Sequence, residues 1–259
     1  MEGGVLGPAE WVGLDNWRQV LDSRETLSSL GTTLEFTVLY VPLVVGLALV
    51  LALLLRRLGR GGGLLRVVVY VPAIAPIVIA AAVWIFMVHP DFGVLSLGPR
   101  SIGIDAPNWL GDSSYALLTI VMLELWRSAG FWAMLVLAAM LAVPQDLYDA
   151  GRIDGARAIR RFLHITLPGI RLTLVVVLLL TFVAALQVFD SVFVLTNGGP
   201  SGATNTVGLY IYKSIFESGE PGYGAALSCM LLVVVMGITA LMALTPRRRG
   251  GSSEPEVWP

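Results

Sequence analysis

The chain is 259 residues long, with 56% hydrophobic residues, only 14% charged residues and a net charge of -1. A soluble domain usually carries about 25% charged residues, so this composition excludes an ordinary soluble enzyme and indicates a protein of the lipid bilayer. The near-neutral net charge gives no reason to expect a nucleic-acid partner.

Apolar runs long enough to cross a bilayer recur along the chain, because roughly 20 helical residues cover about 30 Å of hydrocarbon. The runs are residues 34–55, 67–88, 117–143, 172–194 and 225–245. Barrel strands would alternate apolar and polar residues over about ten positions, and these runs do not. Because backbone groups in lipid must bond internally, the sequence predicts an all-α, polytopic membrane protein with five transmembrane helices.

Arginine is distributed unevenly between the loops that join these spans. The richer loops hold Arg56, Arg57, Arg60 and Arg66 after the first span, Arg152, Arg157, Arg160, Arg161 and Arg171 after the third, and Arg247, Arg248 and Arg249 after the fifth. The positive-inside rule places these loops in the cytoplasm. We therefore expect an external polar lead-in over residues 1–33, a cytoplasmic loop over 144–171 and a cytoplasmic tail over 246–259.

Polar residues inside the spans are costly, so each is a candidate for function. Glu124 and Arg127 lie three apart on one helical face and can pair, with Ser128 beside them. They predict either a polar cavity that binds a hydroxylated solute or a purely structural ion pair. Gln187 and Asp190 also lie three apart, in the fourth span. They indicate either a further part of a solute pathway or an external helix end.

Two prolines, Pro72 and Pro76, interrupt the second span. Proline inside a membrane helix is tolerated where neighbours or water satisfy the freed backbone groups. The span therefore either lines an interior path or carries a simple kink.

Several kinds of chemistry are missing from the sequence. Lys213 is the only lysine and follows no glycine run, so no Walker A loop exists and the chain is not an ATPase by itself. Cys229 is the only cysteine, and His89 and His164 are far apart, so no metal site is expected. A membrane-embedded enzyme would need a convergent catalytic set, and no such motif is visible. An ion-gradient-driven secondary transporter or channel would be favoured by internal repeats, which the sequence does not show.

The polar loop between the third and fourth spans carries the most specific pattern. It runs Asp149-Ala150-Gly151, then Asp154-Gly155-Ala156, then Phe162, Ile165 and Leu167-Pro168. This order resembles the cytoplasmic EAA loop of ABC importer permeases, with Asp149 in place of Glu and Gly151 in place of Ala. Residues 143–148 are similar to the family's lead-in.

Other segments are similar to carbohydrate permeases of the MalF type and to glycerol-phosphate permeases. They are residues 12–17, residues 71–76, the run from Phe189 to Pro200 and residues 209–212. Members of this family carry one more transmembrane helix before the segment that matches residues 12–17, so the resemblance implies that the first family helix is missing here.

The resemblance implies an ATP-driven importer in the bacterial inner membrane, with the N-terminus of this chain outside and its C-terminus inside. Its partners would be a second permease subunit, two copies of an ABC ATPase, which use ATP and Mg, and an external solute-binding protein. This chain would bind no cofactor. The coupling residues would be Asp149, Ala150, Gly151, Asp154, Gly155, Ala156 and Pro168.

The same matching implies a set of substrate-pathway residues for a di- or oligosaccharide, a polyol or a glycerol-phosphate compound. They are Glu124, Arg127, Ser128 and Phe131 in the third span, Thr181, Ala185 and Val188 in the fourth, and Ala73 and Ile77 in the second. Glu124, Arg127 and Ser128 are also the polar residues found without the resemblance, and Phe131 could stack on a sugar ring.

Overall fold

The computed structural model describes residues 11–101, 103 and 105–244, and within these ranges every regular element is a helix. Four helical stretches are long and apolar enough to cross a membrane: Arg24–Arg57, Ser113–Ala142, Ala158–Leu186 and Pro221–Leu241. The pair α3 (Gly63–Ile74) and α4 (Ile77–Met87) also qualifies if its two helices count as one span. The prediction of an all-α membrane protein is confirmed.

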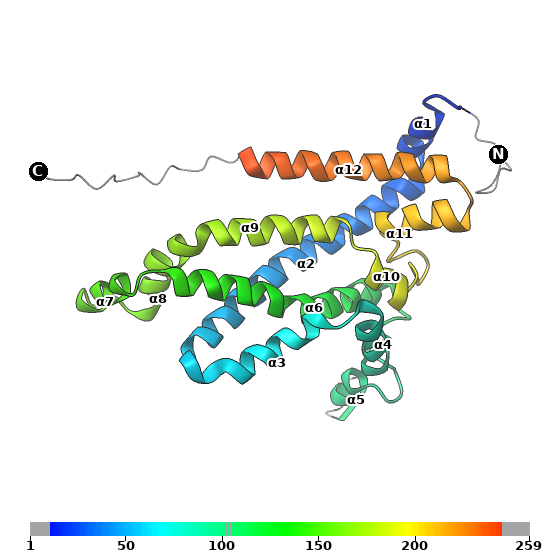
Figure 1. Ribbon diagram of the computed structural model, residues 1–259. Coiled ribbons are helices and arrows are strands. Elements are labelled where there is room, and N and C mark those ends of the chain that lie inside the picture. Colours follow the sequence, from blue (N-terminus) through cyan, green and yellow to red (C-terminus); the bar gives the residue numbers. More distant parts are fainter. Residues whose placement is uncertain (1–10, 102, 104, 245–259) are drawn as a thin grey trace, which may run out of the picture.

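The long helices α2 (Arg24–Arg57), α6 (Ser113–Ala142) and α9 (Leu167–Leu186) pack side by side and form the body of the molecule (Figure 1). At one end lie α1 (Asp15–Asp22), α4, α10 (Asp190–Leu195) and α11 (Val207–Tyr212). After α11 comes a π turn at Lys213–Glu217, and α12 (Pro221–Leu244) then runs back along the bundle beside α9. At the other end, α7 (Gln145–Ile153) and α8 (Ala158–Arg161) project from the bundle, and a π turn at Phe162–Thr166 leads into α9. The remaining elements are a 3₁₀ turn at Gly59–Gly62 and α5 (Val94–Ser101).

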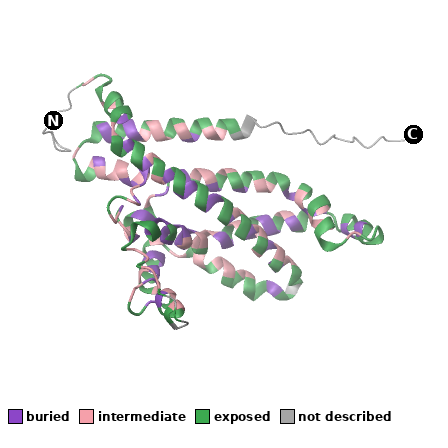
Figure 2. Cartoon of the chain, turned by 180° about the vertical axis from the view of Figure 1, so that it is seen from behind, coloured by how far each residue is buried: buried purple, intermediate pink, exposed green. Residues whose placement is uncertain are grey.

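Burial follows the helix-to-helix faces, whereas the outward faces of the long helices are exposed (Figure 2). Small residues occupy the buried faces of α2 and α6: Ala48, Ala52, Ala129 and Ala133. Small side chains let membrane helices approach closely. Large apolar residues such as Val38, Leu172 and Val233 point outward, as expected where the surroundings are lipid.

Helix α2 begins at Arg24, ten residues before the predicted span, so residues 24–33 are helical. Two buried hydroxyls of this part bond to carbonyl oxygens of their own helix: Ser29 donates to Thr26 at 3.0 Å and Thr33 to Ser29 at 2.8 Å. Because these groups are satisfied locally, residues that look polar in the sequence are compatible with a helix.

The predicted second span, residues 67–88, is not one continuous helix. It is bent by 100° between α3 and α4. Ala75 has an extended backbone (φ -65°, ψ 131°), as residues before proline usually do, and Pro76 starts the new direction. Pro76 therefore marks a broken helix rather than a gentle kink, whereas Pro72 lies inside α3.

The predicted fourth span, residues 172–194, is also interrupted. Helix α9 ends at Leu186, and α10 starts at Asp190 after a non-helical segment. The carbonyl oxygen of Val188 in this segment accepts a hydrogen bond from the Thr206 hydroxyl at 3.1 Å. A side-chain partner thus satisfies a backbone group that the break removes from the helical ladder. The predicted tail, residues 246–259, lies outside the described residues.

Candidate functional site

A cavity of about 450 Å³ forms where α2, the α3–α4 bend, α6 and the α9–α10 break meet. Its lining residues are Phe36, Tyr40, Ala73, Ile77, Glu124, Arg127, Ser128, Phe131, Trp132, Ala184, Ala185, Gln187, Val188, Phe189, Asp190 and Ser191. Small-molecule sites usually measure about 300–1,000 Å³, so this cavity can hold a solute of one or a few rings.

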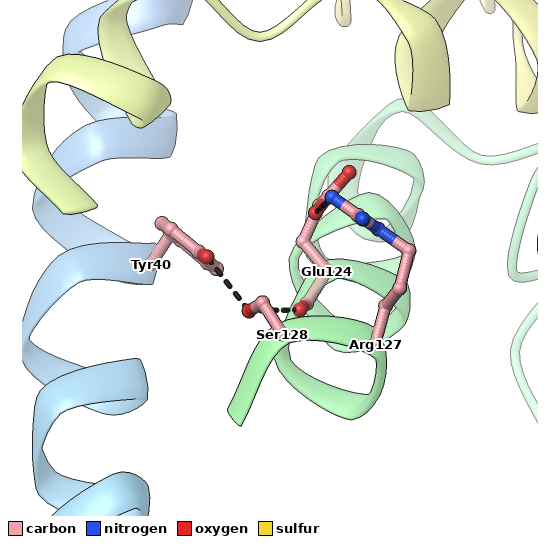
Figure 3. A network of polar contacts seen from close by, with 4 residues as sticks. All are labelled: Tyr40, Glu124, Arg127 and Ser128. Carbon is pink, nitrogen blue, oxygen red and sulfur yellow. Dashed lines mark hydrogen bonds and ion pairs between the residues drawn. The ribbon is translucent and has the colours of Figure 1, made fainter. Parts of the chain in front are cut away.

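A polar network crosses the cavity wall between α2 and α6 (Figure 3). Arg127 Nη2 donates to Glu124 Oε2 at 2.8 Å, which is the pair that their spacing predicts. The Ser128 hydroxyl donates to the Glu124 carbonyl oxygen at 2.6 Å and lies 2.8 Å from the Tyr40 hydroxyl. Glu124 is only 8% exposed, so the ion pair balances a carboxylate that would be costly to bury alone.

Two polar atoms of the lining residues stand outside this network. Arg127 Nε and Ser191 Oγ are buried and bond to no partner among the described residues. Buried donors without partners are costly, so each favours a conformation in which it gains an acceptor.

Aromatic rings cover other parts of the lining. Phe36 stacks on Tyr40 with ring centroids 5.3 Å apart, and Phe131 meets Trp132 edge to face at 4.9 Å. Phe131 is 45% exposed, so one ring remains open to the cavity. Polar hydrogen-bonding groups beside an open ring are the combination that a sugar, with hydroxyl rims and apolar C–H faces, can use.

The cavity brings together every substrate-pathway residue named from the sequence except Thr181. Thr181 lies one turn deeper in α9, is fully buried, and donates to the carbonyl oxygens of Val177 and Leu178. Its hydroxyl is used within its own helix. That a solute contacts the other residues stays a prediction.

Sequence reasoning missed Phe36, Tyr40, Trp132, Ala184, Phe189 and Ser191 as lining residues. Phe36 and Tyr40 belong to a 34-residue apolar helix in which nothing local indicates which side faces inward. Phe189 and Ser191 lie next to the unpredicted break after α9. The signal that could have found the break was the pair Gln187 and Asp190, which also lines the cavity.

The loop with the EAA-like pattern folds as α7, a tight turn and α8. The turn closes with hydrogen bonds from Gly155 N to Arg152 O and from Ala156 N to Gly151 O, both about 3 Å, which is a Schellman motif. Gly155 has φ +69°, and a Cβ there would meet no atom within 4 Å. The turn thus requires glycine for its backbone angle and not for space.

The other loop residues divide into an exposed and a packed group. Asp149, Ala150 and Asp154 are exposed, and Asp149 pairs with Arg152 at 3.0 Å. Gly151 is buried, and a Cβ there would lie 3.1 Å from Ile165 Cδ1, which explains why glycine fits where the family pattern has alanine. Ala156 is half-buried, and Pro168 is exposed in the first turn of α9.

The fold and the cavity define the class: a polytopic membrane protein with a solute-sized polar cavity between its helices and a helical loop exposed at one end. Residues 44–250 match the family described as "Binding-protein-dependent transport system inner membrane component". The chain belongs to this family of ABC importer permeases, which confirms the resemblance seen in the loop.

The relatives are permeases of sugar and glycerol-phosphate transporters. The trehalose/maltose transport system permease protein MalF of Thermococcus litoralis is 37% identical over 92% of this chain and 81% of its own length. The sn-glycerol-3-phosphate transport system permease protein UgpA of Agrobacterium fabrum is 36% identical, over 90% and 79%. The trehalose transport system permease protein SugA of Mycobacterium tuberculosis is 33% identical, over 95% and 76%.

A crystal structure of a bacterial ABC transporter that imports the acidic polysaccharide alginate has the same fold. It superposes with a TM-score of 0.86 at 23% identity, over 95% of this chain and 87% of the other. Nothing in these comparisons supports the alternative of an ion-gradient-driven transporter.

Proposed function

We propose that this chain is the translocation subunit of an ABC importer for a neutral di- or oligosaccharide or a related polyol or glycerol-phosphate solute. The observation that carries the proposal is the cavity between α2, α6 and the α9–α10 break, with its ion pair, its hydroxyl groups and its exposed aromatic ring. The names of the relatives support the same solute class.

The lining charges favour a neutral solute over an anionic one. Glu124 and Asp190 contribute two carboxylates, and Arg127 is the guanidinium that lines the cavity with them. Arg127 already donates to Glu124, so little positive charge is left to attract a phosphate. Hydroxyl groups of a sugar can instead accept from the guanidinium and donate to the carboxylates.

Energy would come from a separate ABC ATPase that binds MgATP and docks on the loop over residues 144–171. The exposed residues Asp149, Ala150 and Asp154 would contact it, and Gly155 and Ala156 would hold the turn. The loop connects directly to α6 and α9, whose far parts carry the cavity residues Glu124 and Ala185. A movement of the loop would therefore shift two walls of the cavity and change its access.

The proposal includes a second permease subunit, two ATPase copies and an extracytoplasmic solute-binding protein. An alginate importer has been solved in complex with its alginate-pentasaccharide-bound periplasmic protein, and such a complex is the arrangement we propose here. The loop and the C-terminus would lie in the cytoplasm and the N-terminus outside, and this chain itself would hydrolyse no ATP.

The test is transport by the complex that co-purifies with the full chain, reconstituted in proteoliposomes with its binding protein. Labelled trehalose, maltose and sn-glycerol 3-phosphate serve as solutes, with and without MgATP. We expect MgATP-dependent uptake of a sugar and weaker uptake of the phosphate. Uptake driven by an ion gradient without ATP, or a chain that co-purifies with no ATPase, would contradict the proposal.

Glu124→Gln tests the cavity itself. It removes the carboxylate that pairs with Arg127 and should raise the KM for the sugar roughly tenfold, which corresponds to about 1.4 kcal/mol. Glu217→Gln makes the same chemical change at an exposed position outside the cavity and should leave uptake unchanged. Equal KM values for the two variants would show that the solute does not use this wall.

A further inference from the structure

Tyr148 links α7 to two other parts of the bundle. Its hydroxyl accepts a hydrogen bond from Arg56 Nη1 at 2.9 Å and lies 3.0 Å from the Thr166 hydroxyl. The guanidinium carbon of Arg56 also lies over the Tyr148 ring, 4.3 Å from its centroid. The Tyr148 side chain is 7% exposed and packs in the core with Leu55, Val143 and Ile170.

These contacts join elements that the chain does not connect directly. Helix α7 follows α6 after two residues, and Thr166 immediately precedes α9. Arg56, by contrast, is 92 residues from Tyr148 and lies in the last turn of α2. Side-chain contact between Tyr148 and Arg56 is thus a direct link from the loop to α2.

Helix α2 carries this link to the cavity. It stays helical from Arg24 to Arg57 although Pro42 lies inside it, and Tyr40, whose hydroxyl is 2.8 Å from Ser128, lies on it. At 1.5 Å per residue, Tyr40 and Arg56 are about 24 Å apart along the helix. If the Arg56 end of α2 moves, the cavity wall that carries Tyr40 therefore moves with it. The loop is joined in sequence to α6 and α9 but not to this wall.

We infer that Tyr148 is a positioning residue that passes movement of the coupling loop to α2 through Arg56 and to the start of α9 through Thr166. Arginine suits this place because its planar guanidinium can stack on a ring and donate in the same geometry. The tyrosine hydroxyl suits it because it can accept from Arg56 and donate to Thr166. The inference rests on the proposed function, since it requires a partner ATPase that moves the loop.

The experiment uses the purified full complex with Cys229→Ser and Ala184→Cys, which leaves one cysteine in this chain, at the cavity wall. The rate at which a membrane-impermeant maleimide labels this chain is measured with and without MgATP, together with ATP hydrolysis. This readout needs no knowledge of the solute. The test variant is Tyr148→Phe, and Arg57→Gln is the control, because Arg57 is the exposed neighbour of Arg56.

We expect Tyr148→Phe to keep ATP hydrolysis but to reduce the MgATP-induced change in labelling roughly tenfold, because both hydrogen bonds of the hydroxyl are lost while the ring stays. Arg57→Gln should respond like the reference chain. A response of Tyr148→Phe as large as that of Arg57→Gln would overturn the inference and leave the proposed function standing. A reference complex without bound ATPase would overturn the proposed function, and this inference with it.

If Tyr148→Phe does not assemble, Arg56→Gln and Thr166→Val decide the matter, since each removes one of the two bonds. Each should lower the MgATP-induced change by about threefold, in line with one hydrogen bond of modest net strength. Full responses from both would overturn the inference. A merely structural role predicts less assembled complex with an unchanged response per complex.

Discussion

The close approach of α3 and α6 beside the cavity gives the sharpest prediction. Gly130 lies on α6 next to the cavity residue Phe131, and a Cβ on it would overlap the carbonyl oxygen of Val69. Because the obstacle is backbone, no rotamer change can relieve it, and α3 must shift as a whole. Val69 is one turn from Ala73, which lines the cavity, so the shift reaches the site.

The magnitude follows from two opposing effects. Alanine stabilises a helix interior by about 0.5–1 kcal/mol relative to glycine, whereas overpacking a close contact costs about 1–3 kcal/mol. Gly130→Ala should therefore lower the free energy of unfolding by about 1–2 kcal/mol. Gly46→Ala is the matched control in α2: a Cβ there meets no atom within 4 Å, so only the stabilising effect remains.

The assay is thermal unfolding of the purified chain, followed by the fluorescence of its seven tryptophans. For a chain of this size, a loss of 1 kcal/mol in the free energy of unfolding lowers the Tm by about 2–4 °C. The Tm of Gly130→Ala should fall by about 2–8 °C, and that of Gly46→Ala should rise slightly. A Tm for Gly130→Ala at or above that of Gly46→Ala would refute the close backbone approach.

Further predictions concern the loop, the opposite end of the bundle and the cavity. Gly155→Asn should reduce uptake per ATP hydrolysed less than Gly155→Val. The constraint is the backbone angle of φ +69°, and asparagine tolerates left-handed backbone angles better than valine does. Equal losses of uptake in the two variants would indicate a steric limit instead. Tyr223→Phe removes the hydrogen bonds of its hydroxyl to Thr26 at 2.9 Å and Tyr210 at 3.1 Å, so the unfolding free energy should fall by about 1–3 kcal/mol, measured by denaturant titration. Thr181→Val should leave the uptake KM unchanged, since its hydroxyl serves its own helix; a clear rise in KM would return Thr181 to the pathway.

The sequence by itself determined the membrane class and the local features of the site. Apolar length decides whether a helix can cross a bilayer, so the long helices could be predicted without any contact. The pairing of Glu124 with Arg127 was predictable because residues three apart on a helix are neighbours in any fold. The loop turn was predictable because its pattern placed Gly155 where a left-handed backbone is needed.

Only the tertiary structure decided where the helices break and which faces meet. The end of α9 at Leu186 depends on a partner elsewhere, Thr206 at Val188. The prolines of the second span left open whether the helix kinks slightly or turns by 100°. Helices that are apolar on all sides carry no periodic mark of an inner face, so nothing local placed Tyr40 at the cavity. The contact of Arg56 with Tyr148 bridges 92 residues and exists only because helix packing brings the two ends together.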